Sequence, residues 1–170
     1  MVPTNTERKK IAEMKTLESV SDNVNWKEAQ QDAARTARWA VTMTKVRIRQ
    51  VRSRTRWQFV TFYGKSGGES AGIVDMLAIR KDQSAPLGVM KRADALQIIL
   101  IQVKGGSAPK PTFEEAERLR RVARRHGARD VLLARWKKGK QAHFFRLREV
   151  SASDWADPWD PVKDLDSVFR

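Results

Sequence analysis

Three polar residues stand near the ends of two segments that otherwise resemble buried strands. Asp75 lies inside the apolar run Gly72–Ile79, and Gln102 and Lys104 end the run that begins at Ile98. Residues two apart on a strand face the same side, so Gln102 and Lys104 project together. If the neighbouring strand brings Asp75 alongside, three functional groups meet at one sheet edge. Polar groups in such places are costly unless they are paired or used, which marks them as a candidate site.

The chemistry that suits this set is metal-assisted phosphodiester hydrolysis. The carboxylate of Asp75, the amide oxygen of Gln102 and the main-chain carbonyl of Val103 are hard oxygen ligands for Mg²⁺ or Mn²⁺. The ammonium group of Lys104 is placed to orient or deprotonate an attacking water and to offset charge on a phosphoryl group. Glu69, in the loop before Asp75, is expected to add a further acid, with a solvated loop carboxylate as the alternative.

The elements around these residues predict an α/β fold: a mixed sheet of four to five strands flanked by helices. Apolar and β-branched runs predict strands, and 3.6-residue periodicity predicts helices. The expected strands span 57–63, 72–79, 96–103, 130–136 and 142–147, and the expected helices span 26–45 and 112–126. Thr112 and Glu115 have the spacing of a capping box. A strand, a helix and a strand in succession imply a right-handed crossover, so strands 96–103 and 130–136 should pair in parallel.

Three regions are expected along the chain. Residues 1–25 are polar and poor in large apolar side chains, which favours a loosely held arm or a short helix. Residues 26–148 form a single α/β domain, and residues 149–170 form an acidic tail. We expect the tryptophans of this tail to dock on the core. The sharper alternative is that the tail covers a basic surface as a mimic of nucleic acid.

Composition points to a polyanionic partner. Lys and Arg outnumber Asp and Glu by 34 to 20, the formal net charge is +14 and the isoelectric point is near 10.6. We therefore expect nucleic acid as the partner, DNA in preference to RNA. The absence of cysteine excludes disulfides, zinc–thiolate sites and cysteine nucleophiles, and makes the cytoplasm the expected location. No window has the roughly 20 apolar residues of a membrane helix, so no membrane partner is expected.

Positive charges gather in two stretches that are candidates for phosphate binding. Between Asp32 and Glu69 there is no acidic residue, and the segment after Lys45 predicts an exposed strand or ribbon. Its candidate residues are Arg47, Arg49, Arg52, Arg54, Arg56 and Lys65. On the helix 112–126, Arg121 and Arg125 are candidates, with Arg118, Arg120 and Arg124 also expected to point away from the core. The alternative for both stretches is a solvated charged face.

The order of a strand with Asp75, a strand with Gln102-Val103-Lys104, an amphipathic helix and another strand resembles the PD-(D/E)XK nuclease superfamily. Gln before x-Lys is similar to the variant in Mrr-type restriction endonucleases, and residues 66–75 resemble the approach to the catalytic Asp in Holliday-junction resolvases of the archaeal type. The resemblance covers about Trp57 to Leu147. It implies a restriction-endonuclease-like core and a Mg²⁺- or Mn²⁺-dependent endonuclease.

Two departures from the family pattern matter. Val74 stands where the family has Pro, and Gln102 replaces a carboxylate, which removes one negative charge from the metal site. Glu69 is the first candidate to replace it; Glu28 or Asp32 on the first helix are others, for which a solvated helix face is the favoured alternative. An inactive nucleic-acid-binding module of the same fold therefore stays open, as does an RNA-associated assembly protein. Because relatives in the family often pair, a homodimer stays open too.

Overall fold

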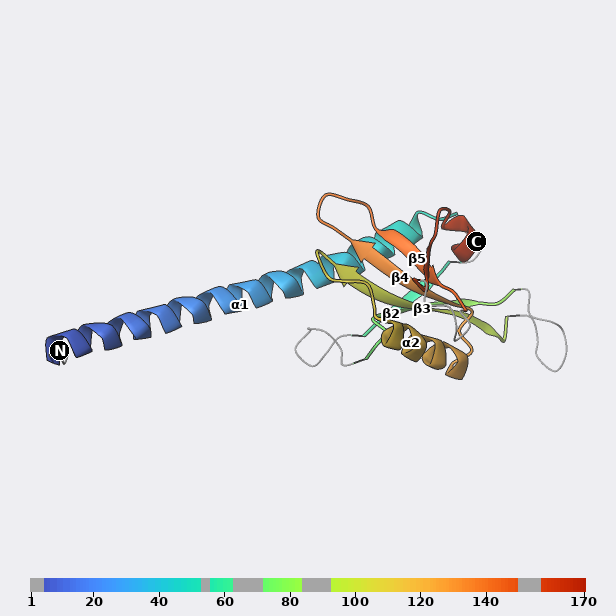
Figure 1. The fold of residues 1–170 in the computed structure, drawn as a ribbon. Coiled ribbons are helices and arrows are strands. Elements are labelled where there is room, and N and C mark those ends of the chain that lie inside the picture. Colours follow the sequence, from blue (N-terminus) through green and yellow to red (C-terminus); the bar gives the residue numbers. More distant parts are fainter. Residues whose placement is uncertain (1–4, 53–55, 63–71, 84–92, 150–156) are drawn as a thin grey trace. The chain divides into compact units, whose positions relative to one another are not determined.

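The computed structural model describes residues 5–52, 56–62, 72–83, 93–149 and 157–170, with side chains from residue 26 onward. The chain divides into two units, Met1–Arg35 and Thr36–Arg170. Helix α1 (Asn5–Arg49) begins in the first unit and ends in the second. It extends beyond the expected helix 26–45 at both ends. The remaining elements belong to the second unit (Figure 1).

A mixed six-stranded sheet forms the centre of the second unit. Its strands lie in sequence order: β1 (Gln58–Thr61), β2 (Met76–Lys81), β3 (Leu96–Gly105), β4 (Asp130–Trp136), β5 (His143–Leu147) and β6 (Trp159–Pro161). Neighbouring strands pair antiparallel except β3 and β4, which are parallel and joined by helix α2 (Phe113–Arg125). The α/β class, the mixed sheet and the parallel pair are thus confirmed, with one or two more strands than expected.

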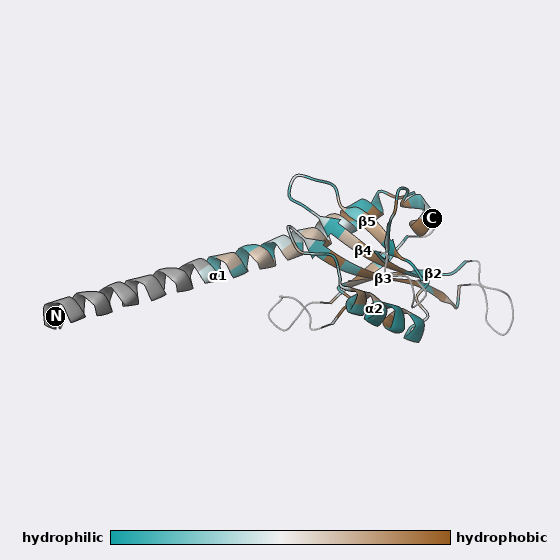
Figure 2. Cartoon of the chain, viewed as in Figure 1, coloured by the Kyte–Doolittle hydropathy of each residue, from teal (hydrophilic) through white to brown (hydrophobic). Residues whose placement is uncertain are grey.

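Two apolar cores cover the two faces of this sheet. On one face, which we call the α1 face, Ala40, Val41 and Ile48 of α1 pack with alternate strand residues such as Ile99 and Ile101. On the other, the α2 face, the stripe Ala116, Leu119 and Ala123 of α2 packs with Leu100 and Leu133, among others. Figure 2 shows the resulting apolar colouring of the central strands. Because β3 is covered on both faces, its run of apolar residues needs no alternation.

Residues 46–49 are helix where the sequence predicts an exposed strand or ribbon, so that prediction is wrong for these residues. Val46 and Ile48 alternate with arginines as in a strand, but the buried positions Ala40, Val41, Thr44 and Ile48 follow the helical repeat. Ile48 is anchored in the core on the α1 face. Arg47 and Arg49 then occupy the last turn of α1, where cations are favoured by the partial negative charge of the helix end.

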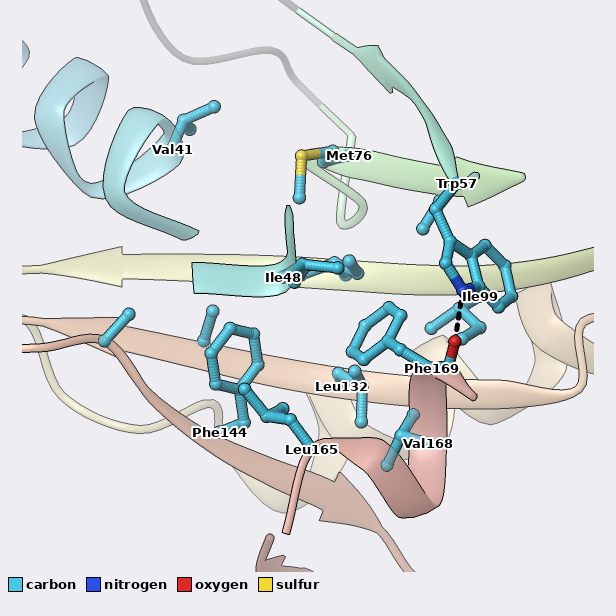
Figure 3. Packing of buried hydrophobic residues seen from close by; sticks show 14 of the residues in the cluster. Val41, Ile48, Trp57, Met76, Ile99, Leu132, Phe144, Leu165, Val168 and Phe169 are labelled. Carbon is cyan, nitrogen blue, oxygen red and sulfur yellow. Dashed lines mark hydrogen bonds between the residues drawn. The ribbon is translucent and has the colours of Figure 1, made fainter. Parts of the chain in front are cut away.

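The C-terminal segment adds the sixth strand and closes the core. Its short helix α3 (Asp166–Phe169) buries Val168 and Phe169 on the α1 face, together with Leu165 (Figure 3). Trp159 of β6 is buried on the α2 face, which confirms docking for this tryptophan; Trp155 lies outside the described residues. The apolar residues of this segment are spaced among acidic ones, and for this reason the sequence predicts an acidic tail rather than a strand and a helix.

Helix α2 begins where its sequence predicts. Thr112 accepts a hydrogen bond from the Glu115 N–H, and the Glu115 side chain accepts one from the Thr112 N–H, so both halves of the capping box form. Arg120 was expected to point away from the core, but it is only 5% exposed. Its guanidinium donates to the Arg148 carbonyl and pairs with Glu117, which compensates for its burial.

Candidate functional site

Asp75 is held at the start of β2, between β1 and β3. Its N–H donates to the Ile101 carbonyl over 3.1 Å, and its carbonyl accepts from the Phe62 N–H over 2.9 Å. Its carboxylate Oδ2 accepts from the Val103 N–H over 2.6 Å. The carboxylate therefore lies against the main chain of the Gln102–Lys104 segment. This juxtaposition, expected from the sequence, is present in the fold.

Gln102 is the one strongly buried polar side chain among the predicted site residues in the described part of the chain. It is 5% exposed, and its Oε1 atom has no hydrogen-bond partner among the residues that the structure describes. Its neighbours on β3 alternate between the two cores: Ile101 packs on the α1 face and Leu100 on the α2 face. Gln102 therefore faces the α2 side, as does Asp75, since the next residue Met76 packs on the α1 face. An amide oxygen without a donor is the kind of group that a hard cation would complete.

Lys104 shares this face and is half-buried. The strand register sets it beside Arg135 of β4, and Arg135 in turn beside His143 of β5. Leu133 and Phe145, two residues away on the same strands, pack on the α2 face, so Arg135 and His143 face that side as well. We call Lys104, Arg135 and His143 the basic row. It begins next to Gln102 and crosses three strands.

Several other predicted residues lie outside the described residues or in the first unit. Glu69, Lys65 and Arg54 lie outside the described residues. Glu28 and Asp32 lie in the N-terminal unit, where Asp32 forms an ion pair with Arg35. The described residues contain no cluster of three or more His, Cys, Asp or Glu side chains that could hold a metal ion. The predicted metal ligands that the structure describes are therefore Asp75 and Gln102, together with the predicted Val103 carbonyl.

One of the predicted phosphate-binding arginines near α1, Arg49, lies on the other face of the sheet. The Arg49 guanidinium lies 5.6 Å from the centroid of the Phe59 ring, which packs against the core on the α1 face. Arg47 donates to the side chain of Gln50, and Arg52 and Arg56 are exposed. These cations are accessible, but the fold separates Arg49 from the side on which Gln102 lies.

The direction of α2 decides toward which end of the sheet its exposed arginines lie. Arg121 and Arg125 are exposed, as expected. Helix α2 runs back along the sheet, since β4 begins opposite Ile99, in the first half of β3. Arg125, in the last turn of α2, therefore lies toward the opposite end of the sheet from Lys104.

The basic row was not predicted, although its residues are plain in the sequence. Arg135 and His143 lie in correctly predicted strands, but their juxtaposition with Lys104 depends on the register between β3, β4 and β5. The available signal was the parallel pairing, which places the carboxyl ends of β3 and β4 at one edge.

Comparisons of this chain with protein-family models, with curated proteins and with solved structures give no match. Among the described residues, no helix is long and apolar enough to cross a membrane. The functional argument therefore depends on the geometry around Asp75 and Gln102.

Proposed function

We propose that the second unit is a divalent-metal-dependent endonuclease that acts on DNA. The observation that carries the proposal is the buried Oε1 of Gln102, which has no partner in the described part of the chain and lies on the same face as the Asp75 carboxylate. Leaving such an oxygen without a donor costs about 1–3 kcal/mol. A Mg²⁺ or Mn²⁺ ion would satisfy it, and Asp75 would supply the charge that an amide lacks.

Each residue has a distinct part in the proposed reaction. Asp75 and Gln102 would hold the ion, with the Val103 carbonyl beside them and Glu69 as a further acid. A metal ion in such a site polarises the phosphoryl oxygen and lowers the pKa of water. Lys104 would orient the attacking water and offset the negative charge that develops on phosphorus. The Val103 N–H holds Asp75 Oδ2 at 2.6 Å, which fixes the direction of the carboxylate.

The order of the elements supports the same proposal. A strand begins after Asp75, the next strand carries Gln102-x-Lys104, and a helix and a parallel strand follow. This is the order that the resemblance to PD-(D/E)XK nucleases requires. The net charge of +14 suits a polyanionic substrate.

Cleavage assays with Lys104→Ala test the proposal. We expect the unsubstituted protein to cut supercoiled, single-stranded or four-way-junction DNA in Mg²⁺ or Mn²⁺ but not in chelator. Lys104→Ala should lower the cleavage rate at least about 100-fold while DNA binding persists, since the group acts on the transition state. Lys81→Ala is the matched control, because Lys81 is an exposed lysine at the far end of β2. Equal cleavage by Lys104→Ala and the control would refute the role of Lys104.

A catalytically inactive DNA-binding module is the second candidate, and the neutral Gln102 favours it. The substitution Gln102→Glu separates the two. In a working site the added carboxylate should tighten Mn²⁺ binding, which calorimetry or the metal dependence of thermal unfolding would measure. Binding of DNA without cleavage in any metal, together with no effect of Gln102→Glu on Mn²⁺ affinity, would establish the inactive module.

A further inference from the structure

A lysine-rich turn extends from the same end of the sheet as the candidate site. The connection between β4 and β5 carries Lys137, Lys138 and Lys140, which we call the lysine turn. The turn follows Trp136. In the sheet, Trp136 pairs with Gly105, the residue after Lys104. The Gly106 N–H also donates to the Trp136 carbonyl over 2.9 Å. The turn therefore begins beside the end of β3 (Figure 1).

The lysine turn has a defined conformation and is flanked by two buried residues. The Lys140 N–H donates to the Lys137 carbonyl over 3.0 Å, and Gly139 takes the left-handed conformation with φ of 76°. Trp136 and Ala142, on either side, are buried in the core on the α1 face. Residues 137–141 between them are exposed. The lysines are thus presented to solvent from a fixed position.

The lysines of the turn have little internal charge compensation. Between Asp130 and Glu149 the chain has six Lys and Arg residues and no acidic residue, and of these six Arg146 and Arg148 pair with Asp130 and Asp160. None of the ion pairs found in the described ranges involves a lysine of the turn. Neighbouring ammonium groups of one sign repel each other, and a polyanion that neutralises them releases its own condensed counterions.

We propose that the lysine turn, together with the basic row, binds the phosphate backbone of DNA beside the Asp75–Gln102 site. The row leads from Lys104 across Arg135 to His143. His143 is the first residue of β5, the strand that follows the turn. A backbone that follows these residues would bring one phosphate to Lys104 and its neighbours to the turn. The inference depends on the proposed function for the identity of the ligand, but the binding surface does not require cleavage.

Two variants that each remove three positive charges test the proposal. The turn variant carries Lys137→Gln, Lys138→Gln and Lys140→Gln. The control variant removes three exposed cations at the other end of the sheet, with Lys81→Gln, Arg124→Gln and Arg170→Gln. Because the net charge is the same in both, a difference between them reports position rather than overall charge. Binding to a short DNA duplex is measured in chelator over a range of salt concentrations, and thermal unfolding verifies that both variants fold.

We expect the turn variant to lower the slope of log affinity against log salt by about two to three, since each phosphate contact contributes about 0.9. The control variant should lower it by less than about one. Equal losses in the two variants would overturn the proposal, as would the absence of any salt-dependent DNA binding by the unsubstituted protein. A selective loss in the turn variant of a protein that never cleaves DNA would support the binding surface and reject the endonuclease.

Discussion

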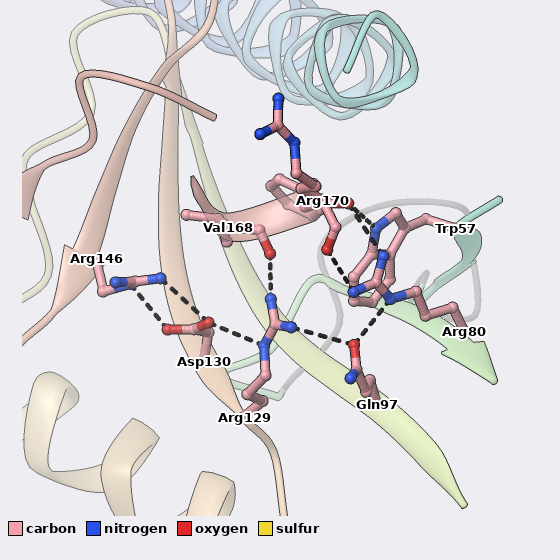
Figure 4. Close-up of polar contacts among 9 residues, drawn as sticks. Trp57, Arg80, Gln97, Arg129, Asp130, Arg146, Val168 and Arg170 are labelled. Atoms are coloured by element: carbon pink, nitrogen blue, oxygen red, sulfur yellow. Dashed lines mark hydrogen bonds and ion pairs between the residues drawn. The ribbon is translucent and has the colours of Figure 1, made fainter. Parts of the chain in front are cut away.

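At the scale of single residues, β3 offers two glutamines in contrasting environments. Gln97, near its start, has an Oε1 that accepts from Arg80 and Arg129 (Figure 4). Gln102, near its end, is buried with an Oε1 that accepts from no group in the described ranges. The first is a structural acceptor between two cations. The second costs stability in the absence of a ligand, which is typical of residues retained for function.

Replacing each glutamine by leucine should therefore have opposite effects on stability. Gln102→Leu removes an unsatisfied oxygen and adds apolar surface, so we expect a free energy of unfolding about 1 kcal/mol higher in chelator, together with loss of cleavage. Gln97→Leu removes one hydrogen-bond acceptor from each of two guanidinium groups and should lower that free energy by about 1–2 kcal/mol. Urea denaturation measures both. A Gln102→Leu variant as unstable as Gln97→Leu would show that the amide is structural.

At the scale of elements, the close approach of β3 to α1 depends on one glycine. A Cβ atom added at Gly105 would lie 3.1 Å from the Thr36 carbonyl oxygen and 3.2 Å from the Ala40 Cβ. Both contacts are shorter than ordinary van der Waals separation, and one involves backbone, which cannot rotate away. The end of β3, which carries Lys104, is thus positioned by its packing on α1.

Gly105→Ala should consequently destabilise the second unit by about 1–3 kcal/mol, the usual cost of overpacking. It should also lower cleavage, because α1 and β3 must separate slightly next to Lys104. Ser107→Ala, at an exposed position in the following turn, is the control and should change the free energy of unfolding by less than about 0.5 kcal/mol. Denaturation curves that overlap for the two variants would contradict the close packing.

Local signals predicted some elements better than others, for physical reasons. The capping box of α2 and the bounds of β4 involve contacts within a few residues, so the sequence predicts both as the structure has them. The end of α1 was predicted wrongly because Val46 and Ile48 fit a strand period locally, while the burial of Ile48 depends on distant strands. The Asp75–Gln102–Lys104 juxtaposition follows from two predicted strands, of which 96–103 closely matches β3, whereas 72–79 starts too early because β2 begins at Met76. The basic row also needed the register of a third strand.

At the scale of the whole molecule, the C-terminal segment completes the core on the α1 face. The Trp57 Nε1–H donates to the Phe169 carbonyl over 2.7 Å, and the two rings meet edge to face with centroids 5.5 Å apart (Figure 3). Arg80 donates to the carbonyls of Phe169 and Arg170, and Arg129 to that of Val168 (Figure 4). Burial and the nearby Arg129 lower the pKa of Arg80, which partly opposes these contacts.

Phe169→Ala should therefore destabilise the whole second unit rather than release a tail. Phe169 is fully buried, and loss of a buried phenyl ring costs about 3–5 kcal/mol. Leu96→Ala is the control, because Leu96 is 56% exposed and its truncation should cost less than about 1 kcal/mol. A single unfolding transition shifted by the first substitution and not by the second would bear this out. Under the alternative of a removable acidic cover, the domain would keep its stability without Phe169.

The acidic residues of the same segment make its attachment sensitive to pH. Burial raises the pKa of Asp157, but the hydrogen bonds from the Lys110 ammonium and the Trp159 N–H, with the charges of Lys110 and Arg148, outweigh it and lower that pKa. A carboxyl group whose pKa is lower in the folded state stabilises that state above its unfolded pKa, near 4. This contribution is lost as the pH falls through the folded value.

Asp157→Asn should thus lower the free energy of unfolding at pH 7 and have little effect at pH 2. The loss should stay below about 1 kcal/mol, because the Asp157 side chain is 54% exposed and solvent screens the pair. The substitution Lys110→Met removes the main partner, so Asp157→Asn in that background should have a smaller effect at pH 7. Urea denaturation of the four proteins at both pH values separates the pair from the other contacts of Asp157. An effect of Asp157→Asn that is equal at both pH values would show that the charge of Asp157 is not its cause, and would contradict a contribution of the Lys110–Asp157 ion pair to stability.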